Sequence, residues 1–392
     1  MNTQKEKYIP LSVPNITDLE IEYVVETLDQ GWISSVGPIV NKFEEAISSY
    51  VGSKYACACS SGTTGLHLAL LSVGVDSRDI VLVPTLTFIA AVNPVKYIGA
   101  EPIFFDCDES LCLDPNSIKS FLNEECVIQD GNTIHKESQK IVKAMIVVHV
   151  FGNIANMSEL MGISKKYNIK LIEDATEALG SKFVDGQFSN GYAGTFGDIG
   201  VYSFNGNKII STGSGGMLVS NNKVFIDKAK HLSTQAKSDS VYYFHDEIGY
   251  NYRLSSIQAA LGLAQLSRIE GFIKTKESSN KFYSNKLNQY SNLSIVGFTP
   301  GTRPNYWLSS IRVSSNVVRD ELMIYMGKNK IEARPIWDLI HKQNPYKSAR
   351  FYGSQNADKF LDTILNIPSS TNITFEELER VVEVISEYFN EL

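Results

Sequence analysis

Short apolar runs alternate with amphipathic stretches between residues 54 and 220, and this alternation limits the possible folds more than any other feature of the chain. The apolar runs have the length of β-strands and lie at 54–59, 80–84, 101–105, 142–148, 169–173, 199–204 and 216–220. Several of them are separated by stretches with helical spacing of apolar residues, at 62–73, 88–98 and 156–167. Repeated strand–helix–strand order is typical of a mostly parallel sheet covered on both faces, in which ligands bind at the carboxyl ends of the strands.

A change of sequence character near residue 265 predicts a second, smaller domain. Residues 253–290 are rich in helix formers, whereas residues 293–392 carry several Pro and Asn residues, two or three short strand patterns and a last helix pattern at 375–389. We therefore expect a large α/β domain over residues 1–265 and a small C-terminal α+β domain over residues 266–392. The polar segment 125–139 is expected to be a surface excursion.

The composition is that of a folded globular protein. The chain has 392 residues, of which 43% are apolar, so it can bury a sizeable core. Its net charge of −7 argues against a nucleic-acid partner, and it has neither a signal-peptide core nor a run of 18 apolar residues. We therefore expect a cytoplasmic protein that binds neither nucleic acid nor membrane.

The cysteines have no metal-site or disulfide pattern. The chain has five, an odd number without any CxxC pair, so we expect small buried side chains and no bound metal. They are Cys57, Cys59, Cys107, Cys112 and Cys126.

Two glycine-containing motifs are candidates for phosphate binding. SSGTTG at 60–65 follows a predicted strand and opens a predicted helix, where Gly62 lets the backbone approach a ligand and hydroxyls lie beside free N–H groups. A capped helix start without a ligand is the alternative. STGSGG at 211–216 has no strand leading into it and no helix after it, so we expect turn glycines there and no dinucleotide site.

An acid and a lysine at two other strand ends extend this pattern. Glu173 and Asp174 are consecutive in EDATEALG and point to opposite sides of the strand, so only one of them can face a ligand. That ligand could be a metal, a sugar hydroxyl or a protonated ring nitrogen. The alternative is that the carboxylate only caps the next turn. Lys208, in SFNGNKIISTGSGG, taken alone is typical of a surface loop. Together, a phosphate cradle, a strand-end acid and a strand-end lysine are the three parts of a pyridoxal phosphate site.

Further motifs lie in order along the whole chain: GWISSVGPIVNKFEEAISSYVG, SSGTTGLHLAL, PTLTFIAAVNPV, GAEPIFFDCD, VHVFGN, IEDATEALGS, GDIGVYSFNGNK, GYNYRLSSIQAALGLAQL and IEARPIW. Through them the chain resembles the sugar aminotransferases of the DegT/DnrJ/StrS family. The resemblance implies the fold-type-I transferase fold, like that of aspartate aminotransferase, with a mostly parallel mixed sheet in the large domain. It also implies pyridoxal 5'-phosphate as cofactor and a homodimer with the active site at the interface.

The resemblance assigns roles around the cofactor ring. Lys208 would hold the cofactor's aldehyde as a Schiff base and then move the proton of the reaction, Asp174 would pair with the ring nitrogen, and Phe88 would stack on the ring. Glu177 stands near the ring hydroxyl, where many members of the family have Gln. A carboxyl group there needs a proton or a donor partner.

The resemblance also assigns residues to the phosphate and the sugar. Gly62, Thr63 and Ser203 would bind the phosphate, and Asn251 would reach the phosphate in the neighbouring subunit. Some loop residues either line the sugar pocket or serve the structure only: Trp32, Ser35, Asn305, Arg334 and His341.

The branch of the family that the chain most resembles acts on 4-keto-6-deoxy-2-acetamido sugars in bacillosamine and legionaminic acid routes, for surface glycan or nonulosonic acid synthesis. The expected reaction moves the amino group of L-glutamate, leaving 2-oxoglutarate, to C4 of a UDP-linked sugar of this kind. A GDP-linked or a 3-keto sugar is the alternative within the family. A nucleotide-binding oxidoreductase and a non-catalytic binding protein are the alternatives outside it, and the joint presence of Lys208 and Asp174 favours the aminotransferase.

Overall fold

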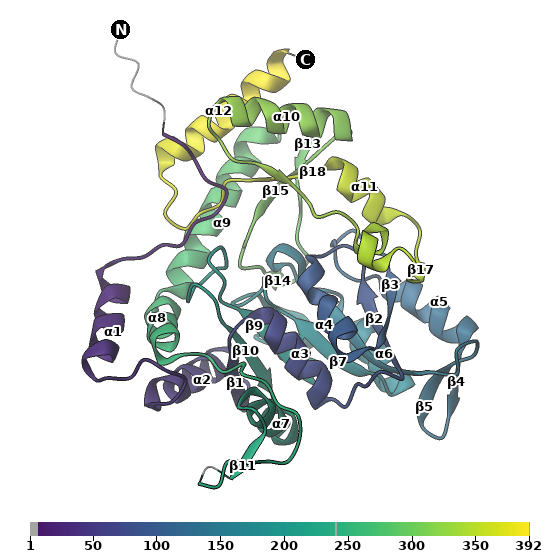
Figure 1. The fold of residues 1–392 in the computed structure, drawn as a ribbon. Coiled ribbons are helices and arrows are strands. Elements are labelled where there is room, and N and C mark those ends of the chain that lie inside the picture. The colour runs from purple at the N-terminus through teal and green to yellow at the C-terminus, as the bar shows by residue number, and fades with distance from the viewer. Residues whose placement is uncertain (1–6, 240, 392) are drawn as a thin grey trace.

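A large mixed sheet flanked by helices forms the body of the molecule, with a smaller sheet and its helices beside it (Figure 1). The computed structural model describes residues 7–239 and 241–391. The main path of the large sheet runs in the order β1 (Tyr55–Cys59), β10 (Gly216–Ser220), β9 (Ile199–Ser203), β7 (Lys170–Asp174), β6 (Ile141–Val148), β2 (Asp79–Pro84), β3 (Glu101–Phe105) and β17 (Phe351–Tyr352).

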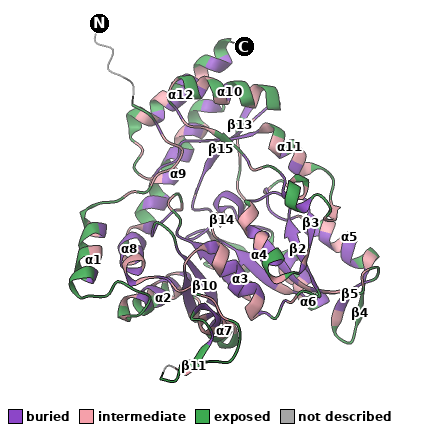
Figure 2. Cartoon of the chain, viewed as in Figure 1, coloured by how far each residue is buried: buried purple, intermediate pink, exposed green. Residues whose placement is uncertain are grey.

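The large sheet confirms the predicted strand pattern. Strands β9, β7, β6, β2 and β3 pair in parallel, and β10 is antiparallel to both of its neighbours. The seven predicted strands are all present, with bounds that differ by at most one residue from the apolar runs. Their near-continuous apolar sequence fits burial on both faces, and Figure 2 shows these strands as buried.

Helices cover both faces of the large sheet. They are α2 (Pro38–Val51), α3 (Gly62–Ser72), α4 (Asn93–Ile98), α5 (Pro115–Glu125), α6 (Met157–Tyr167) and α7 (Lys223–Ser233). Outside them, α8 (Ser256–Ser267) packs on α2, and α1 (Asp18–Asp29) packs on α8. The single helix predicted at 88–98 is wrong. The structure has a 3-10 turn, η1 (Ile89–Ala91), followed by α4, because Pro94 has no N–H to continue one helix and is suited to the first turn of the next.

The second sheet is antiparallel. Its strands lie in the order β13 (Leu293–Ile295), β15 (Ser309–Val313), β18 (Ile364–Ile367) and β16 (Arg334–Pro335), and β14 (Thr302–Arg303) pairs with β8 (Lys182–Phe183). Its helices are α9 (Ile269–Leu287), α10 (Asn316–Lys328), α11 (Asn356–Thr363) and α12 (Phe375–Glu391). Two-residue strands such as β14, β16 and β17 are too short to leave a periodic pattern, which explains why the sequence predicts only two or three strands here.

Each sheet has its own core. The larger core fills both faces of the large sheet and contains all five cysteines, which are free and buried as predicted. The smaller core lies among the second sheet, α9, α10 and α12 and includes Ile9 from the N-terminal segment. The loops around the large sheet contain four further short 3-10 turns: η2 (Val150–Gly152), η3 (Gly186–Phe188), η4 (Ile340–Lys342) and η5 (Asn344–Tyr346).

The segment 125–139, expected to be a surface excursion, contains a β-hairpin that was not predicted from the sequence. Strands β4 (Cys126–Gln129) and β5 (Asn132–His135) are joined by Asp130 and Gly131, which both have positive φ. An Asp-Gly pair is a typical two-residue hairpin turn because both positions tolerate left-handed backbone. This pair was the sequence signal for the hairpin.

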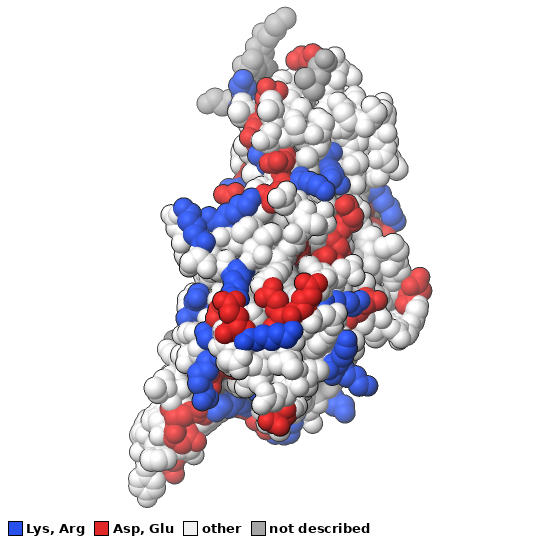
Figure 3. Space-filling model, turned by 90° about the vertical axis from the view of Figure 1, so that its right-hand side faces the viewer, with Lys and Arg blue, Asp and Glu red and all other residues white. Residues whose placement is uncertain are grey.

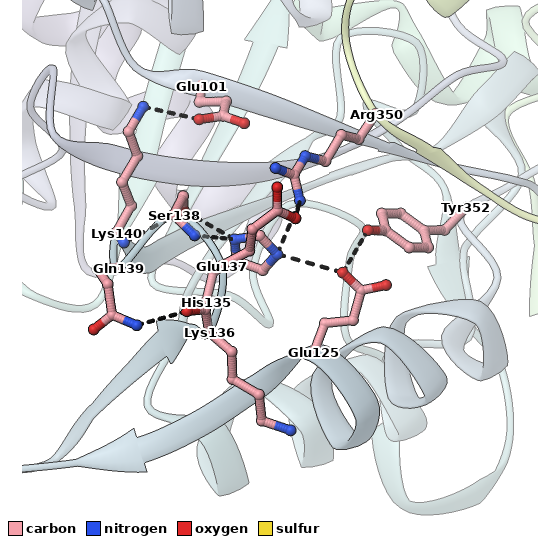
Figure 4. Close-up of polar contacts among 10 residues, drawn as sticks. All are labelled: Glu101, Glu125, His135, Lys136, Glu137, Ser138, Gln139, Lys140, Arg350 and Tyr352. Carbon is pink, nitrogen blue, oxygen red and sulfur yellow. Dashed lines mark hydrogen bonds and ion pairs between the residues drawn. The ribbon is translucent and has the colours of Figure 1, made fainter.

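The hairpin is tied to strand β17 by a polar cluster (Figure 4). His135 is buried, and its Nε2 atom lies 3.4 Å from Oε2 of Glu125 and 3.2 Å from Nη1 of Arg350. The Tyr352 hydroxyl donates a hydrogen bond of 2.7 Å to the same Glu125 oxygen. Strand β17 pairs in parallel with β3, so residues 351–352 belong to the large sheet although they lie late in the chain. The domain boundary at residue 265 stays a prediction.

The surface carries charges of both signs. Figure 3 shows Lys and Arg interspersed with Asp and Glu over the face that lies to the right in Figure 1. In the described residues, no helix combines the length and the apolar character needed to cross a membrane.

Candidate active site

The carboxyl ends of β7 and β9 and the N-terminus of α3 meet at one cavity of about 370 Å³, here called the Lys208 cavity. Asp174 pairs in register with Val201, so the two parallel strands end on the same side of the sheet. The cavity is lined by every residue predicted to bind the cofactor except Asn251: Gly62, Thr63, Phe88, Asp174, Glu177, Ser203 and Lys208. The sequence motifs therefore converge in space.

The two consecutive acids at the end of β7 face different surroundings, as strand alternation predicts. The Glu173 carboxylate is fully buried and accepts hydrogen bonds from His149 Nε2 and from the backbone N–H groups of Gly194, Phe196 and Gly197. Asp174 lines the Lys208 cavity, where its Oδ1 accepts one hydrogen bond of 3.1 Å from the Thr176 N–H. Asp174 is thus the acid that can meet a ligand.

Burial is the largest influence on the pKa of Asp174. It raises the pKa of this carboxyl above the ordinary value, and the Thr176 hydrogen bond and the charges of Lys208 and His149 offset only part of that effect. A cationic ring nitrogen beside the carboxyl would lower the pKa and favour the ionised form. The position fits the pairing of a carboxylate with a pyridinium nitrogen.

Lys208 lies in the loop after β9 and points into the cavity between a carboxyl group and an indole ring. Its Nζ atom is 3.6 Å from Oε1 of Glu177 and 3.9 Å from the centre of the Trp307 ring. The Lys208 side chain is only 12% exposed. Two attractive neighbours hold this ammonium group in a place that water reaches poorly.

Glu177 is buried behind Lys208. Its Oε2 accepts a hydrogen bond of 2.8 Å from the N–H of Phe151, a residue held in left-handed backbone conformation at φ 57°. Burial raises the pKa of Glu177 to about 7, although the charge of Lys208 acts in the opposite direction. The donor that a carboxyl group needs at this position is therefore the Phe151 amide, and Lys208 supplies the opposite charge.

The first turn of α3 forms a narrow cradle. Ser61 caps the helix, with its Oγ accepting from the Thr64 N–H at 3.1 Å, so the capped helix start is real. The N–H groups of Gly62 and Thr63 lie in the first turn, where backbone donors have no partner within the helix. A Cβ atom at Gly62 would lie 2.9 Å from Cβ of Ser203 and from Cγ2 of Thr176, so only glycine leaves the space open. Free donors, a hydroxyl and this space fit a phosphate group.

The second glycine-rich motif forms turns, as predicted. Gly213 and Gly215 have φ values of 77° and 144°, which favour glycine, and the chain then enters β10. Ser214 and Gly215 also line the Lys208 cavity.

The other predicted residues do not line the Lys208 cavity. Asn251 is exposed and pairs with Thr234. Trp32 and Ser35 are exposed in the loop before α2, where Trp32 borders a separate hollow between α1, α2 and α8. Their predicted roles stay predictions.

The three late candidates for the sugar pocket make contacts within the protein. Asn305 is fully buried and donates to the carbonyl groups of Glu177 and Leu179, which holds the Glu177 turn. Arg334 is exposed and pairs with Glu332. The His341 ring stacks on Phe351 at 4.1 Å, and its Nδ1 bonds with the Thr85 hydroxyl.

Sequence reasoning missed several residues that line the Lys208 cavity. Trp307 is the most important, because its ring contacts Lys208 and its Nε1 donates 2.6 Å to the carbonyl oxygen of Asn207. It enters from the region of the second sheet, and no spacing along the chain relates it to Lys208. Trp337 is the last residue of the motif IEARPIW and could have been chosen on that ground.

Comparisons with known proteins identify the family of this chain. The model of the DegT/DnrJ/EryC1/StrS aminotransferase family matches residues 14–386. The GDP-perosamine synthase of Escherichia coli O157:H7 is 37% identical over 98% of this chain and 100% of its own length, and that of Vibrio cholerae is 32% identical over 97% and 99%. A UDP-4-amino-4,6-dideoxy-N-acetyl-beta-L-altrosamine transaminase of Campylobacter jejuni (strain 81-176) is 28% identical over 96% of each chain.

Solved structures have the same fold. A DegT DnrJ EryC1 StrS aminotransferase from Brucella abortus superposes with a TM-score of 0.85 over 95% of each chain, at 25% identity. The fold-type-I transferase fold is therefore confirmed, with its mostly parallel large sheet and smaller antiparallel sheet.

Proposed function

The chain belongs to the DegT/DnrJ/EryC1/StrS family of pyridoxal phosphate-dependent sugar aminotransferases, and we propose that it moves the amino group of L-glutamate to C4 of a nucleotide-linked 4-keto-6-deoxy sugar. Membership of this family sets aside the oxidoreductase and the non-catalytic alternatives. The observation that carries the proposal is the convergence of Lys208, Asp174 and the α3 N-terminus on one cavity.

The residues of the Lys208 cavity fit pyridoxal phosphate. When bound, this cofactor supplies an aldehyde that exchanges amino groups and a ring that withdraws electrons. The α3 N-terminus and the Ser203 hydroxyl would bind its phosphate, Asp174 would hold a proton on the ring nitrogen, and Phe88 would cover the ring. Phe88 suits this role because it lines the cavity while its side chain is otherwise exposed.

Lys208 carries the proton movement. Once its amine is free, Nζ would take the proton from Cα of glutamate and deliver a proton to C4′ of the cofactor. In the second half of the reaction the same atom would work in the reverse direction, delivering a proton to C4 of the sugar. Trp307 supports this role because its ring holds Nζ inside the cavity.

The proposed substrate is a 4-keto-6-deoxy sugar linked to GDP. Support comes from the relatives named GDP-perosamine synthase, which are 37% and 32% identical over nearly the whole chain. The second candidate is the UDP-linked 2-acetamido sugar expected from the sequence motifs. Its support is the 28% identical transaminase whose name contains a UDP-linked 4-amino-4,6-dideoxy-N-acetyl sugar, the kind of product that amination of such a keto sugar gives.

We also propose that the enzyme acts as a homodimer. Strands β11 (Lys237–Asp239) and β12 (Phe244–His245) form a projecting hairpin (Figure 1) with exposed apolar side chains. These side chains are Val241, Tyr242, Tyr243 and Phe244, with Ile248 beyond the hairpin. Asn251, a few residues later, is exposed and does not line the Lys208 cavity of the same chain. It is therefore free to contact a cofactor bound in the Lys208 cavity of a partner subunit.

Absorption spectroscopy tests the proposal in two steps. The protein is loaded with pyridoxal phosphate, and L-glutamate alone is added; we expect the visible band of the loaded enzyme to fade as a near-ultraviolet band of pyridoxamine phosphate appears. GDP- and UDP-linked 4-keto-6-deoxy sugars, with a 3-keto sugar as control, are then tested for the return of the visible band. Loss of the first change in wild type, or its persistence in Lys208→Ala, would overturn the proposal.

A further inference from the structure

Glu177 and Lys208 form a buried ion pair that the proposed roles do not yet use. Oε1 of Glu177 lies 3.6 Å from Nζ of Lys208, and the two side chains are 3% and 12% exposed. The other carboxyl oxygen is fixed by the Phe151 N–H at 2.8 Å. One oxygen is thus anchored by the backbone, while the other faces the amine.

The charges around Glu177 do not balance in the cavity. Lys208 is the cation that acts on Glu177, whereas Asp174 adds a second negative charge and the Cys112 thiol is a further ionisable neighbour. Two buried carboxyl groups therefore face one ammonium group in the cavity, because His149, which also lowers the Asp174 pKa, is paired with the buried Glu173. Such a cluster favours states in which a carboxyl group holds a proton, because a buried charge without full compensation is costly.

We propose that Glu177 is the proton partner of Lys208. The N–H bond of the Lys208 ammonium breaks, an O–H bond forms at Oε1 of Glu177, and the pair changes from ammonium and carboxylate to amine and carboxylic acid. The proton stays inside the cavity, so neither hydroxide nor bulk water is needed. In the reverse step Glu177 returns the proton to Nζ.

Two physical facts support this transfer. The transfer replaces two buried charges by two neutral groups, which removes a desolvation penalty that water would otherwise have to offset. Burial also raises the pKa of Glu177 to about 7, nearer to that of an amine than an ordinary carboxyl group would be. A lysine is mostly protonated at neutral pH and then is not a base, so an internal acceptor has a clear use.

The inference is specific to a glutamate at this position. Glutamine has almost the same shape as glutamate, but its amide oxygen cannot take up a proton at neutral pH. The Glu177→Gln variant would therefore still position the pyridoxal phosphate but would not accept the Lys208 proton. The inference rests on the proposed role of Lys208 as the amine that holds the cofactor.

The rate of covalent cofactor attachment provides the test. Apoenzyme is mixed with pyridoxal phosphate, and the rise of the visible band is followed from about pH 5.5 to about pH 9.5, a range that covers the Glu177 carboxyl group. For wild type we expect the rate to rise through about pH 7, as Glu177 becomes free to accept, and then to level off. For Glu177→Gln we expect no inflection near this pH and a rate lower by at least about tenfold above it.

Two further variants, Glu177→Asp and Lys208→Ala, serve as controls for the attachment-rate experiment. Glu177→Asp keeps a carboxyl group farther from Nζ and should keep the inflection at a reduced rate. A Glu177→Gln curve with the shape of the wild-type curve, at the same or at a uniformly lower rate, overturns the inference. Covalent attachment in Lys208→Ala would instead overturn the proposed role of Lys208, so the two failures are distinguishable.

An infrared measurement covers the case in which Glu177→Gln does not fold. Removal of the ammonium group in Lys208→Met takes away the charge that lowers the Glu177 pKa. The carbonyl band of a protonated carboxyl group should therefore persist to higher pH in Lys208→Met than in wild type. Identical bands in the two proteins at every pH would overturn the inference.

Discussion

Two neighbouring acidic residues at the end of β7, Glu173 and Asp174, have different roles. Glu173 is satisfied by the protein alone, through His149 and three backbone N–H groups, whereas Asp174 has a single backbone donor and faces the cavity. Sequence alternation predicts that only one of the two can meet a ligand. It could not say which one, because the answer depends on the loop at 194–197 that folds over Glu173.

Substitution of each acid separates the two roles. Asp174→Asn keeps the shape but no longer holds a proton on the ring nitrogen, so turnover should fall by roughly 100-fold or more with little loss of stability. Glu173→Gln leaves several buried donors poorly matched and should lower the free energy of unfolding by about 1–3 kcal/mol. Turnover and thermal unfolding are measured for both variants. Wild-type turnover in Asp174→Asn would remove Asp174 from its role.

A second buried lysine makes stability depend on pH. Lys276 in α9 is 2% exposed and donates to the carbonyl groups of Trp307 and Ser369. Burial lowers its pKa to about 7 from 10.5. Between these values the unfolded chain binds a proton that the folded chain lacks, so this group makes the free energy of unfolding rise with pH from about 7 to 10.5. The same gain is lost as pH falls from 10.5 to about 7, and little of this dependence remains below about 7.

Lys276→Met should remove this pH dependence. The slope of unfolding free energy against pH should be smaller in the variant by up to one proton, about 1.4 kcal/mol per pH unit. Urea unfolding from about pH 7 to about pH 10 measures the difference from wild type. Lys274→Met, at an exposed position of the same helix, is the matched control and should keep the wild-type slope. Equal slopes for wild type and Lys276→Met would contradict the prediction.

The Lys208 cavity forms where two strands and one helix have their ends at the same edge of the large sheet. The strands β7 and β9 stop at the same edge of the sheet, and α3 starts there with its first turn against Ser203. The apolar runs and the helical spacing were sufficient to predict these elements and their order. The hairpin β4–β5 was missed because its Asp-Gly turn was not used, and Trp307 was missed because only tertiary packing brings it to Lys208.

The space beside Gly62 makes a prediction at this scale. Gly62→Ala places a methyl group 2.9 Å from Ser203 and Thr176, so the first turn of α3 must shift and cofactor affinity should fall at least about tenfold. Gly271→Ala in α9 is the control, because nothing lies within 4 Å of the added Cβ atom. The control should keep cofactor affinity and gain up to about 1 kcal/mol of stability. Titration of each variant with pyridoxal phosphate measures the affinity. Equal affinities in Gly62→Ala and Gly271→Ala would contradict the role of the first turn of α3 in phosphate binding.

At the scale of the molecule, the two sheets act together at one site. The large sheet and the loop after β9 supply Asp174 and Lys208, while Trp307, just before strand β15 of the second sheet, lies beside Nζ. Trp307 is tied to α9 through Lys276 and to the Lys208 loop through Asn207. The cavity is still open where Phe88 is exposed, and the apolar hairpin between β11 and β12 projects away from the body. These two features together suggest that a second copy of the chain completes the site.

Mixing of two inactive variants tests the shared site. Lys208→Ala lacks the amine of its own cavity, and Asn251→Ala lacks the residue proposed to reach the partner's cavity. In a mixed dimer one cavity has its own Lys208 and the other chain's Asn251, so an equal mixture should hold about a quarter of intact sites. We expect turnover well above the mean of the two variants after unfolding and refolding together. Tyr242→Asp with Phe244→Asp should abolish this recovery by preventing association. A mixture that stays at the mean of its components would place Asn251 outside the partner's site, whatever the oligomeric state.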